Sequence, residues 1–226
     1  MFYRFFLFRL IERFTYKNKP YFCRNYFDMS IKKAYLFVFL ILLIDQASKV
    51  YVKTNFKMFD EVTIFDWFQI KFIENEGMAW GIELPGDYGK LFLTLFRIVA
   101  VGGIIWWLWD SVKKNASNYL RVAIVLILAG AIGNIIDSVF YGVIFNESTT
   151  QQVATIFSDQ PYGTAFHGKV VDMFYFPIWR GVLPSWIPIW GGQEASFFNA
   201  IFNVADFAIS TGFGILLVFN KKCFQS

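Results

Sequence analysis

Ionisable and amide side chains stand inside long apolar stretches of this sequence. The residues in question are Asp45, Lys49, Asn134, Asp137, Asn203 and Asp206. Ionisable groups are costly in lipid, and they usually face a helix-bundle interior or a wet cavity. Two carboxyl groups that share one proton can hydrolyse a peptide bond, because one acts as a base toward water and the other as an acid toward the leaving amine. Carboxylates in a membrane suit a proton relay equally well, so a proton-coupled small transporter is the alternative.

The spacing of these residues places them on single helix faces. Residues at intervals of three or four are Asn199, Asn203, Asp206 and Ser210 in one stretch, and Gly130, Asn134 and Asp137 in another. Such intervals put side chains on one side of a helix. Asp45 and Lys49 are one helical turn apart and can form an ion pair. We expect the three sets to converge at one depth, about seven residues or 10 Å inside the last span, with Gly130 and Gly133 permitting close helix contact.

Four stretches are apolar enough to cross a bilayer as helices, which takes about 20 residues. They cover about 34–52, 91–109, 120–141 and 197–219. Their basic flanks are Lys32 and Lys33, then Lys113, Lys114 and Arg121, then Lys221 and Lys222. The positive-inside rule places these three clusters in the cytoplasm. The sequence therefore predicts a mainly α membrane protein with four transmembrane helices, both termini cytoplasmic and a small β-containing extracytoplasmic subdomain.

Composition and charge narrow the class of protein. Only 17% of the residues are charged, against about 25% in soluble domains. Residues 1–28 carry six basic and two acidic side chains, which accounts for the whole net charge of +4. The rest of the chain is neutral, which argues against a nucleic-acid partner. His167 is the single histidine, so a multi-histidine metal site is excluded, and we expect no metal or other cofactor.

The segments between the spans, about 53–90 and 142–196, are predicted to lie outside the membrane. Residues 61–77 hold β-branched and aromatic runs that are typical of short strands. Residues 176–190 interleave Trp179, Trp186 and Trp190 with three prolines and cannot form a regular helix. These tryptophans suit the lipid headgroup layer, and a loop packed on the outer subdomain is an equally good interpretation.

The basic, aromatic N-terminus (1–28) precedes a single predicted membrane domain over 29–226. Residues 1–28 lack the long apolar core of a cleavable signal peptide. One interpretation is an amphipathic anchor on the inner leaflet. The other, which we favour, is that this extension lies upstream of the native start and that the working protein begins at Met29.

Four short strings carry a family resemblance. They are DQASK (45–49), NEGMAWG (75–81), GAIGNIID (130–137) with VVDMF (170–174), and FNVAD (202–206). In this order and topology, over about residues 31–219, the chain resembles lipoprotein signal peptidase, also called signal peptidase II. The resemblance implies an aspartic endopeptidase with Asp172 and Asp206 as its catalytic pair.

The resemblance also implies which residues support that pair. It points to Asn75 and Gly77, to Gly133 and Asn134, to Asn203 and Ala205, and to Asp45. We expect Asp45 and Asp137 to be structural supports, with Lys49 and Gly130 beside them, and Asn134 and Asn203 to hold the substrate backbone or orient the carboxylates. The chain departs from the family pattern at Ser138, where arginine is usual, at Met173, where phenylalanine is common, and in longer segments at 142–169 and 177–197.

The resemblance implies the substrate and the setting as well. The substrate is a bacterial prolipoprotein, cut just before a diacylglyceryl-modified cysteine at the outer face of the inner membrane. The partners it implies are lipidated prolipoproteins, membrane lipids and cyclic peptide inhibitors such as globomycin. A non-catalytic membrane scaffold is the third interpretation, and it leaves the gathering of four polar strings at one face unexplained.

Overall fold

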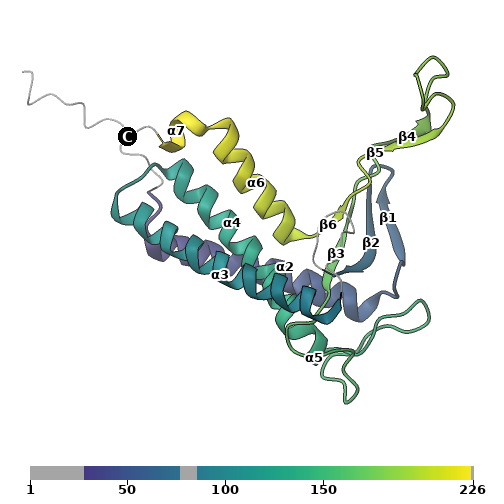
Figure 1. The fold of residues 1–226 in the computed structure, drawn as a ribbon, viewed down its shortest axis with the longest axis horizontal. Helices are drawn as coiled ribbons and strands as arrows, with labels where there is room; N and C mark the ends of the chain where they lie inside the picture. Colours follow the sequence, from purple (N-terminus) through teal and green to yellow (C-terminus); the bar gives the residue numbers. More distant parts are fainter. Residues whose placement is uncertain (1–27, 77–85, 225–226) are drawn as a thin grey trace, which may run out of the picture.

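The computed structural model describes residues 28–76 and 86–224. Within them, four helices form a bundle (Figure 1): α2 (Ile31–Asn55), α3 (Gly86–Lys113), α4 (Asn118–Ile136) and α6 (Val204–Val218). The short helix α7 (Asn220–Phe224) follows α6. Three candidate membrane spans are long and apolar enough to cross a bilayer, namely Ile31–Asn55, Tyr88–Lys113 and Asn118–Ile144. The predicted extension at 1–28 lies, except for Asp28, outside the described residues, as does Gly77.

Side-chain caps fix where the helices begin. The hydroxyl of Ser30 accepts a hydrogen bond from the backbone N–H of Lys33 at the start of α2, and Ser117 caps Leu120 at the start of α4 in the same way. Each cap satisfies one of the backbone donors that the first turn leaves unpaired. Hydropathy places the predicted spans of about 34–52 and 91–109 correctly. The helices α2 and α3 nevertheless extend beyond these spans at both ends.

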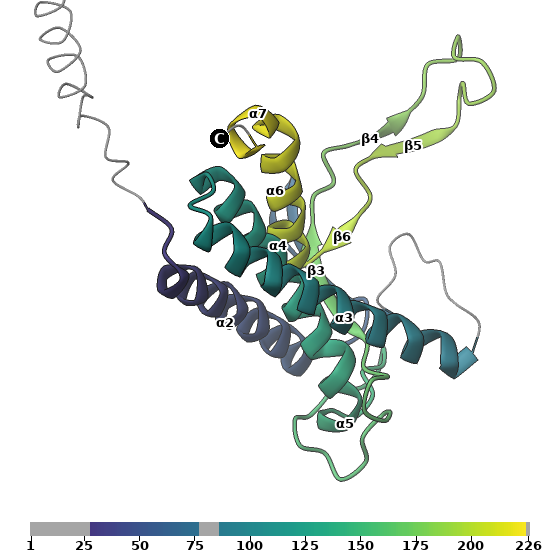
Figure 2. The ribbon, with the colours of Figure 1, turned by 60° about the vertical axis from the view of Figure 1, so that its left-hand side comes forward.

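Helix α4 is the centre of the bundle, because it contacts α2, α3 and α6 (Figure 2). A Cβ on Gly130 would clash with the carbonyl oxygen of Ala205, and one on Gly133 would lie 2.6 Å from the carboxylate of Asp45. Neither position has room for a side chain. The glycines therefore let α4 approach α6 and α2 closely, as their spacing predicts.

Replacing Gly130 by alanine should destabilise the bundle. The added methyl group would meet the backbone of α6, which cannot move aside as a side-chain end can, and overpacking of this kind costs about 1–3 kcal/mol. Thermal unfolding in detergent micelles measures the loss. Gly102→Ala in α3 is the matched control, because a methyl group added there would meet nothing within 4 Å. An equal loss in both variants would contradict the packing argument.

The C-terminal end of α4 widens into a π-helical turn. Residues Asp137–Tyr141 form this turn, η2, and α5 (Gly142–Ile144) completes the span. Such turns are rare and often occur at functional sites. Here the turn holds Asp137, Ser138 and Tyr141, all of them buried, and so presents polar groups to the centre of the protein.

A small antiparallel sheet crosses one end of the bundle (Figure 1). Its strands, in spatial order, are β1 (Glu61–Phe65), β2 (Phe68–Asn75), β3 (Val170–Tyr175) and β6 (Ile201–Phe202). The strands predicted within 61–77 are therefore confirmed. Buried Phe72, Val171 and Met173 join Tyr141 and Phe145 in a core between the sheet and the end of α4. A separate hairpin pairs β4 (Trp179–Val182) with β5 (Glu194–Phe197).

The prediction of a helix over 197–219 is wrong at its N-terminal end. Phe198 has a φ of 66°, Ile201 and Phe202 pair with β3, and the helix begins only after Asn203. Asn199 therefore does not share a helix face with Asp206, and its side chain accepts a hydrogen bond from the Tyr175 hydroxyl at 3.0 Å. Asp206 lies in the first turn of α6 rather than two turns inside it.

Candidate active site

Asp172 lies in the middle of β3, opposite Ile73 of β2, and is only 2% exposed. Its two carboxyl oxygens accept hydrogen bonds from two asparagine side chains. The Nδ2 of Asn75 donates to Oδ2 at 2.5 Å, and the Nδ2 of Asn203 donates to Oδ1 at 2.7 Å. Asn75 ends β2 and Asn203 precedes α6, so the carboxyl group is held from two separate elements.

Asp206 is positioned by the first turn of α6. Its backbone N–H donates to Oδ1 of Asn203 at 2.9 Å, and its Oδ2 accepts from the backbone N–H of Asn203 at 3.3 Å. This reciprocal arrangement is a capping box. Its Oδ1 accepts from Nδ2 of Asn134 at 2.8 Å. The side chain is half-buried, and the positive charge of Arg97 on α3 also acts on it.

Asn203 brings the two aspartates together. Its side-chain amide binds the carboxyl group of Asp172, and its backbone amide binds the carboxyl group of Asp206. The two aspartates are 34 positions apart along the chain and come from different elements. One residue therefore anchors both carboxyl groups, and the negative charge of Asp206 acts on Asp172.

Burial and, after it, the charge of Asp206 raise the pKa of Asp172 from 3.8 to about 8. The charge of Lys49 and the amide groups of Asn75 and Asn203 favour the charged form of Asp172, but they do not outweigh its burial. Asp172 therefore keeps its proton near neutral pH.

The raised pKa predicts that stability falls as the pH rises. In the unfolded chain Asp172 loses its proton near pH 4, whereas the folded protein keeps it until about pH 8. The stabilisation is therefore complete below pH 4 and is lost progressively up to about pH 8, by an amount on the order of a few kcal/mol. Denaturant unfolding at a series of pH values in this window measures the loss. Asp172→Asn should flatten that dependence, and an unchanged slope in the variant would contradict the assignment.

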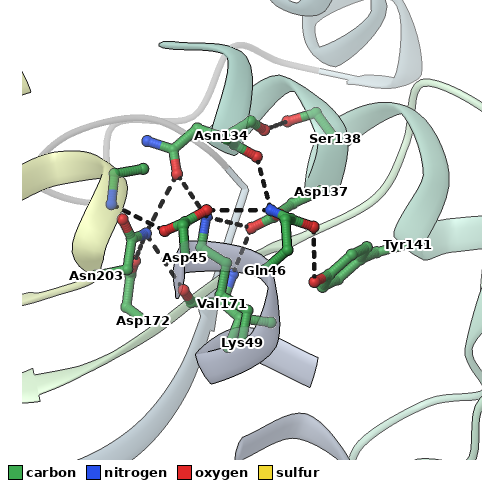
Figure 3. Close-up of polar contacts among 12 residues, drawn as sticks. Asp45, Gln46, Lys49, Asn134, Asp137, Ser138, Tyr141, Val171, Asp172 and Asn203 are labelled. Carbon is green, nitrogen blue, oxygen red and sulfur yellow. Dashed lines mark hydrogen bonds and ion pairs between the residues drawn. The ribbon is translucent and has the colours of Figure 1, made fainter. Parts of the chain in front are cut away.

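Lys49 of α2 is surrounded by three side-chain oxygens (Figure 3). Its Nζ lies 2.9 Å from Oδ2 of Asp45, 2.9 Å from Oδ2 of Asp137 and 3.0 Å from Oδ1 of Asn134. The side chains of Lys49, Asp45 and Asp137 are fully buried. The expected Asp45–Lys49 ion pair is thus present, and Asp137 joins it from the π-helical turn.

This network connects to the elements that carry the aspartates. Oδ1 of Asp45 accepts from the backbone N–H of Ala205 at 2.8 Å, and Oδ2 of Asp137 accepts from the backbone N–H of Val171 at 3.3 Å. Ala205 and Val171 precede Asp206 and Asp172 by one residue each. Two buried carboxylates therefore hold the backbone directly before both aspartates.

Gln46 also belongs to the network, although the sequence patterns above do not single it out. Its Nε2 donates to Asp137 at 2.9 Å, to Asp45 at 3.1 Å and to the carbonyl of Gly133 at 3.2 Å, and its Oε1 accepts from the Tyr141 hydroxyl. Its place in the string DQASK, beside Asp45, is the signal that could have found it.

Ser138, at which the resemblance noted above leads us to expect arginine, takes a local role. Its hydroxyl donates to the carbonyl of Asn134 at 3.0 Å, one turn earlier on the same helix. The side chain is buried within the π-helical turn. At this position the chain therefore satisfies a backbone carbonyl beside the site and brings no positive charge to it.

A second buried ion pair ties the long outer segment to the sheet. Lys53, near the end of α2, pairs with Glu74 of β2, and its Nζ donates to the Ser148 hydroxyl at 3.0 Å. The same Nζ lies 4.9 Å from the ring centroid of Tyr162. Glu74 is adjacent to Asn75, so this cluster, built partly by the longer segment at 142–169, fixes the end of β2 that reaches Asp172.

Comparisons with known proteins agree on one family. The sequence profile of signal peptidase (SPase) II matches residues 37–221. The lipoprotein signal peptidase of Porphyromonas gingivalis is 50% identical over 182 residues, covering 80% of this chain and 79% of that protein. The lipoprotein signal peptidase of Amoebophilus asiaticus is 35% identical over 200 residues, covering 85% and 79%.

A solved structure described as a bacterial membrane enzyme shares the fold. It superposes with a TM-score of 0.56 at 23% identity, covering 87% of this chain and 93% of the other. The family profile spans most of the sequence, and every polar string quoted above falls within it. The chain therefore belongs to the signal peptidase II family of membrane aspartic peptidases.

Proposed function

We propose that this protein removes signal peptides from diacylglyceryl-modified bacterial prolipoproteins, with Asp172 and Asp206 as its catalytic pair. The cut falls just before the lipidated cysteine. The observation that carries the proposal is the double role of Asn203, which donates one hydrogen bond to each carboxyl group. This arrangement supports a shared proton, which two-carboxylate hydrolysis requires. The family assignment favours this function over a proton-coupled transporter.

The proposed reaction needs one ionised and one protonated carboxyl group. The ionised carboxylate takes a proton from water as the water oxygen bonds to the scissile carbonyl carbon. The protonated carboxyl gives its proton to the nitrogen as the C–N bond breaks. Asn75 and Asn203 hold Asp172, and Asn134 holds Asp206, so both groups are oriented before substrate binds.

The proposed topology has four spans with both termini in the cytoplasm. The three lysine clusters lie at helix ends that meet: the N–H of Met29 donates to Asn118, and the Ser117 hydroxyl donates to the carbonyl of Cys223. The aspartates lie at the other end of the bundle, which the positive-inside rule would place outside. At about 1.5 Å per residue the 15 residues of α6 rise about 22 Å, less than the roughly 30 Å of a hydrocarbon core. Asp206 would then sit below the outer surface, at the depth where a signal helix ends.

Cleavage of a defined precursor tests the proposal. The full chain, reconstituted in phospholipid vesicles, is given a prolipoprotein peptide with a diacylglyceryl-modified cysteine, and the products are identified by mass spectrometry. We expect a product whose first residue is the lipidated cysteine, and no cleavage of the same peptide without the lipid. Cleavage at another bond, or equal cleavage of both peptides, would contradict it. Inhibition by globomycin, which the resemblance implies, belongs to the same proposal.

A further inference from the structure

The hairpin of β4 and β5 presents an apolar tip that no other part of the described chain covers. We call residues 179–197 the arm. Trp186 and Ile189 at the tip are 79% and 84% exposed, and Val182 and Trp190 are also exposed. Figures 1 and 2 both show the arm standing clear of the helices. For Trp186 and Trp190, the interpretation of residues 176–190 as a loop packed on the outer subdomain is therefore wrong.

The exposed tip is nevertheless an ordered structure. The backbone N–H of Leu183 donates to Gln193, and that of Gly192 donates back to Leu183, so the ladder continues beyond β4 and β5. Inside the tip, the N–H of Gly191 donates to the carbonyl of Ile187 at 3.0 Å. Ile189 has a φ of 72°, a conformation that is unfavourable for a β-branched residue. The turn thus holds a large apolar side chain outward in a backbone conformation that glycine would adopt more easily.

The direction and the amino-acid composition of the arm indicate that its partner is the lipid headgroup layer. The sheet crosses the end of the bundle, and the arm continues from the sheet sideways, across the direction of the helices (Figures 1 and 2). If the helices span a bilayer, the arm runs along its outer surface. The arm holds three tryptophans and a single pair of opposite charges, Arg180 and Glu194. Tryptophan is enriched in the headgroup layer, where its amphipathic ring is stable.

The base of the arm is joined to β3 and β6 by aromatic contacts. Phe176, which follows β3, stacks on Phe202 of β6 with ring centroids 5.6 Å apart, and Phe198 contacts Phe202 edge-on at 6.1 Å. Phe202 directly precedes Asn203. These contacts connect the base of the arm to the segment that anchors both aspartates.

From these observations we propose that the tip of the arm inserts into the headgroup layer of the outer leaflet and fixes the height of the active site relative to the lipid surface. The proposal rests on the topology given under the proposed function. It identifies a lipid-binding surface that lies outside the catalytic pair, built by the longer segment at 177–197.

Site-directed spin labelling of the full chain in vesicles of phosphatidylethanolamine and phosphatidylglycerol tests the insertion. One label is placed at Ser185→Cys in the tip and a control label at Thr150→Cys, an exposed position in a polar run, both in a Cys23→Ser/Cys223→Ala background. We expect a several-fold higher ratio of oxygen to nickel-chelate accessibility at 185 than at 150. Equal, water-like ratios would overturn the proposal. Shielding of 185 from both reagents would also overturn it, in favour of a protein contact such as a second copy of the chain.

The effect on cleavage is tested separately. Trp186→Ser/Ile189→Ser/Trp190→Ser should raise KM for the lipidated precursor several-fold in vesicles with little change in kcat, and the conservative Trp186→Phe/Ile189→Leu/Trp190→Phe should behave as the wild type. Unchanged kinetics in the serine variant would overturn the proposed influence on the active site. The label positions are also measured in Asp172→Asn. If the spin labels place the arm in lipid but the wild type does not cleave the precursor, only the proposed function is rejected. If the wild type cleaves the precursor but the labels place the arm in water, only this inference is rejected.

Discussion

Replacing Asp172 or Asp206 by asparagine should lower kcat for the lipidated precursor by about 10²–10⁴-fold or more, with a smaller effect on KM. An amide cannot take a proton from water or give one to the leaving nitrogen at neutral pH, so either substitution removes one half of the proposed acid–base pair. An interaction needed only for the chemical step appears in kcat rather than in KM. Single-turnover cleavage of the precursor in vesicles measures the effect.

The two substitutions should differ in how they disturb the site. In Asp172→Asn an amide nitrogen would face either Asn75 or Asn203, both of which donate to this side chain now. In Asp206→Asn the oxygen can still accept from Asn134, and the new nitrogen faces the backbone N–H of Asn203, whose contact is long at 3.3 Å. We therefore expect Asp206→Asn to stay closer to the wild-type fold, which makes it the cleaner test of chemistry.

Asp159→Asn is the matched control, because Asp159 is exposed in the outer segment and the same change there should leave cleavage intact. Thermal unfolding of each variant shows whether a loss of activity is a loss of fold. A folded Asp206→Asn protein that cleaves at the wild-type rate would rule out the pair as the catalytic machinery.

The sequence predicts the helices well but places one helix start wrongly. Apolar runs identify α2, α3 and α4, because lipid-spanning helices need long uninterrupted apolar stretches. The run from 197 to 219 is continuous in hydropathy, although its first residues pair as strand with β3. Short apolar runs do not distinguish strand from helix. The signal that decides is Asn203 followed three residues later by Asp206, a pattern related to the capping box that hydropathy ignores.

For the candidate site, too, the sequence strings predict which residues come together. The ion pairs between helices are visible only in the structure. The family strings bring Asp172, Asp206, Asn75, Asn134 and Asn203 together as a group, and the structure places them in one hydrogen-bonded set. The strings do not show that Lys49 bridges Asp45 and Asp137, because that contact joins residues 88 positions apart. Periodicity describes neighbours on one helix, whereas a buried network depends on how α2 and α4 pack.

Replacing Lys49 by methionine should destabilise the protein by about 3–5 kcal/mol, since it leaves buried carboxylates without their cation. Asp45 and Asp137 are both fully buried, and Lys49 Nζ lies 2.9 Å from each. The loss is measured by heating the protein in detergent and following maleimide labelling of Cys223, which is buried in the folded state, in a Cys23→Ser background. Lys32→Met on the same helix is the control, because Lys32 is exposed and surface changes of this kind stay within about 0.5 kcal/mol.

A second substitution separates the charge from the packing of Lys49. In Lys49→Met/Asp137→Asn one of the two uncompensated carboxylates is gone, so the double variant should be more stable than the sum of the single losses implies, with a coupling energy of about 0.5–3 kcal/mol. Strict additivity would mean that Lys49 acts by filling space. Because Asp45 and Asp137 hold the backbone before Asp206 and Asp172, coupling through Lys49 would also mean that the charge balance around Lys49 acts on the segments that carry both aspartates.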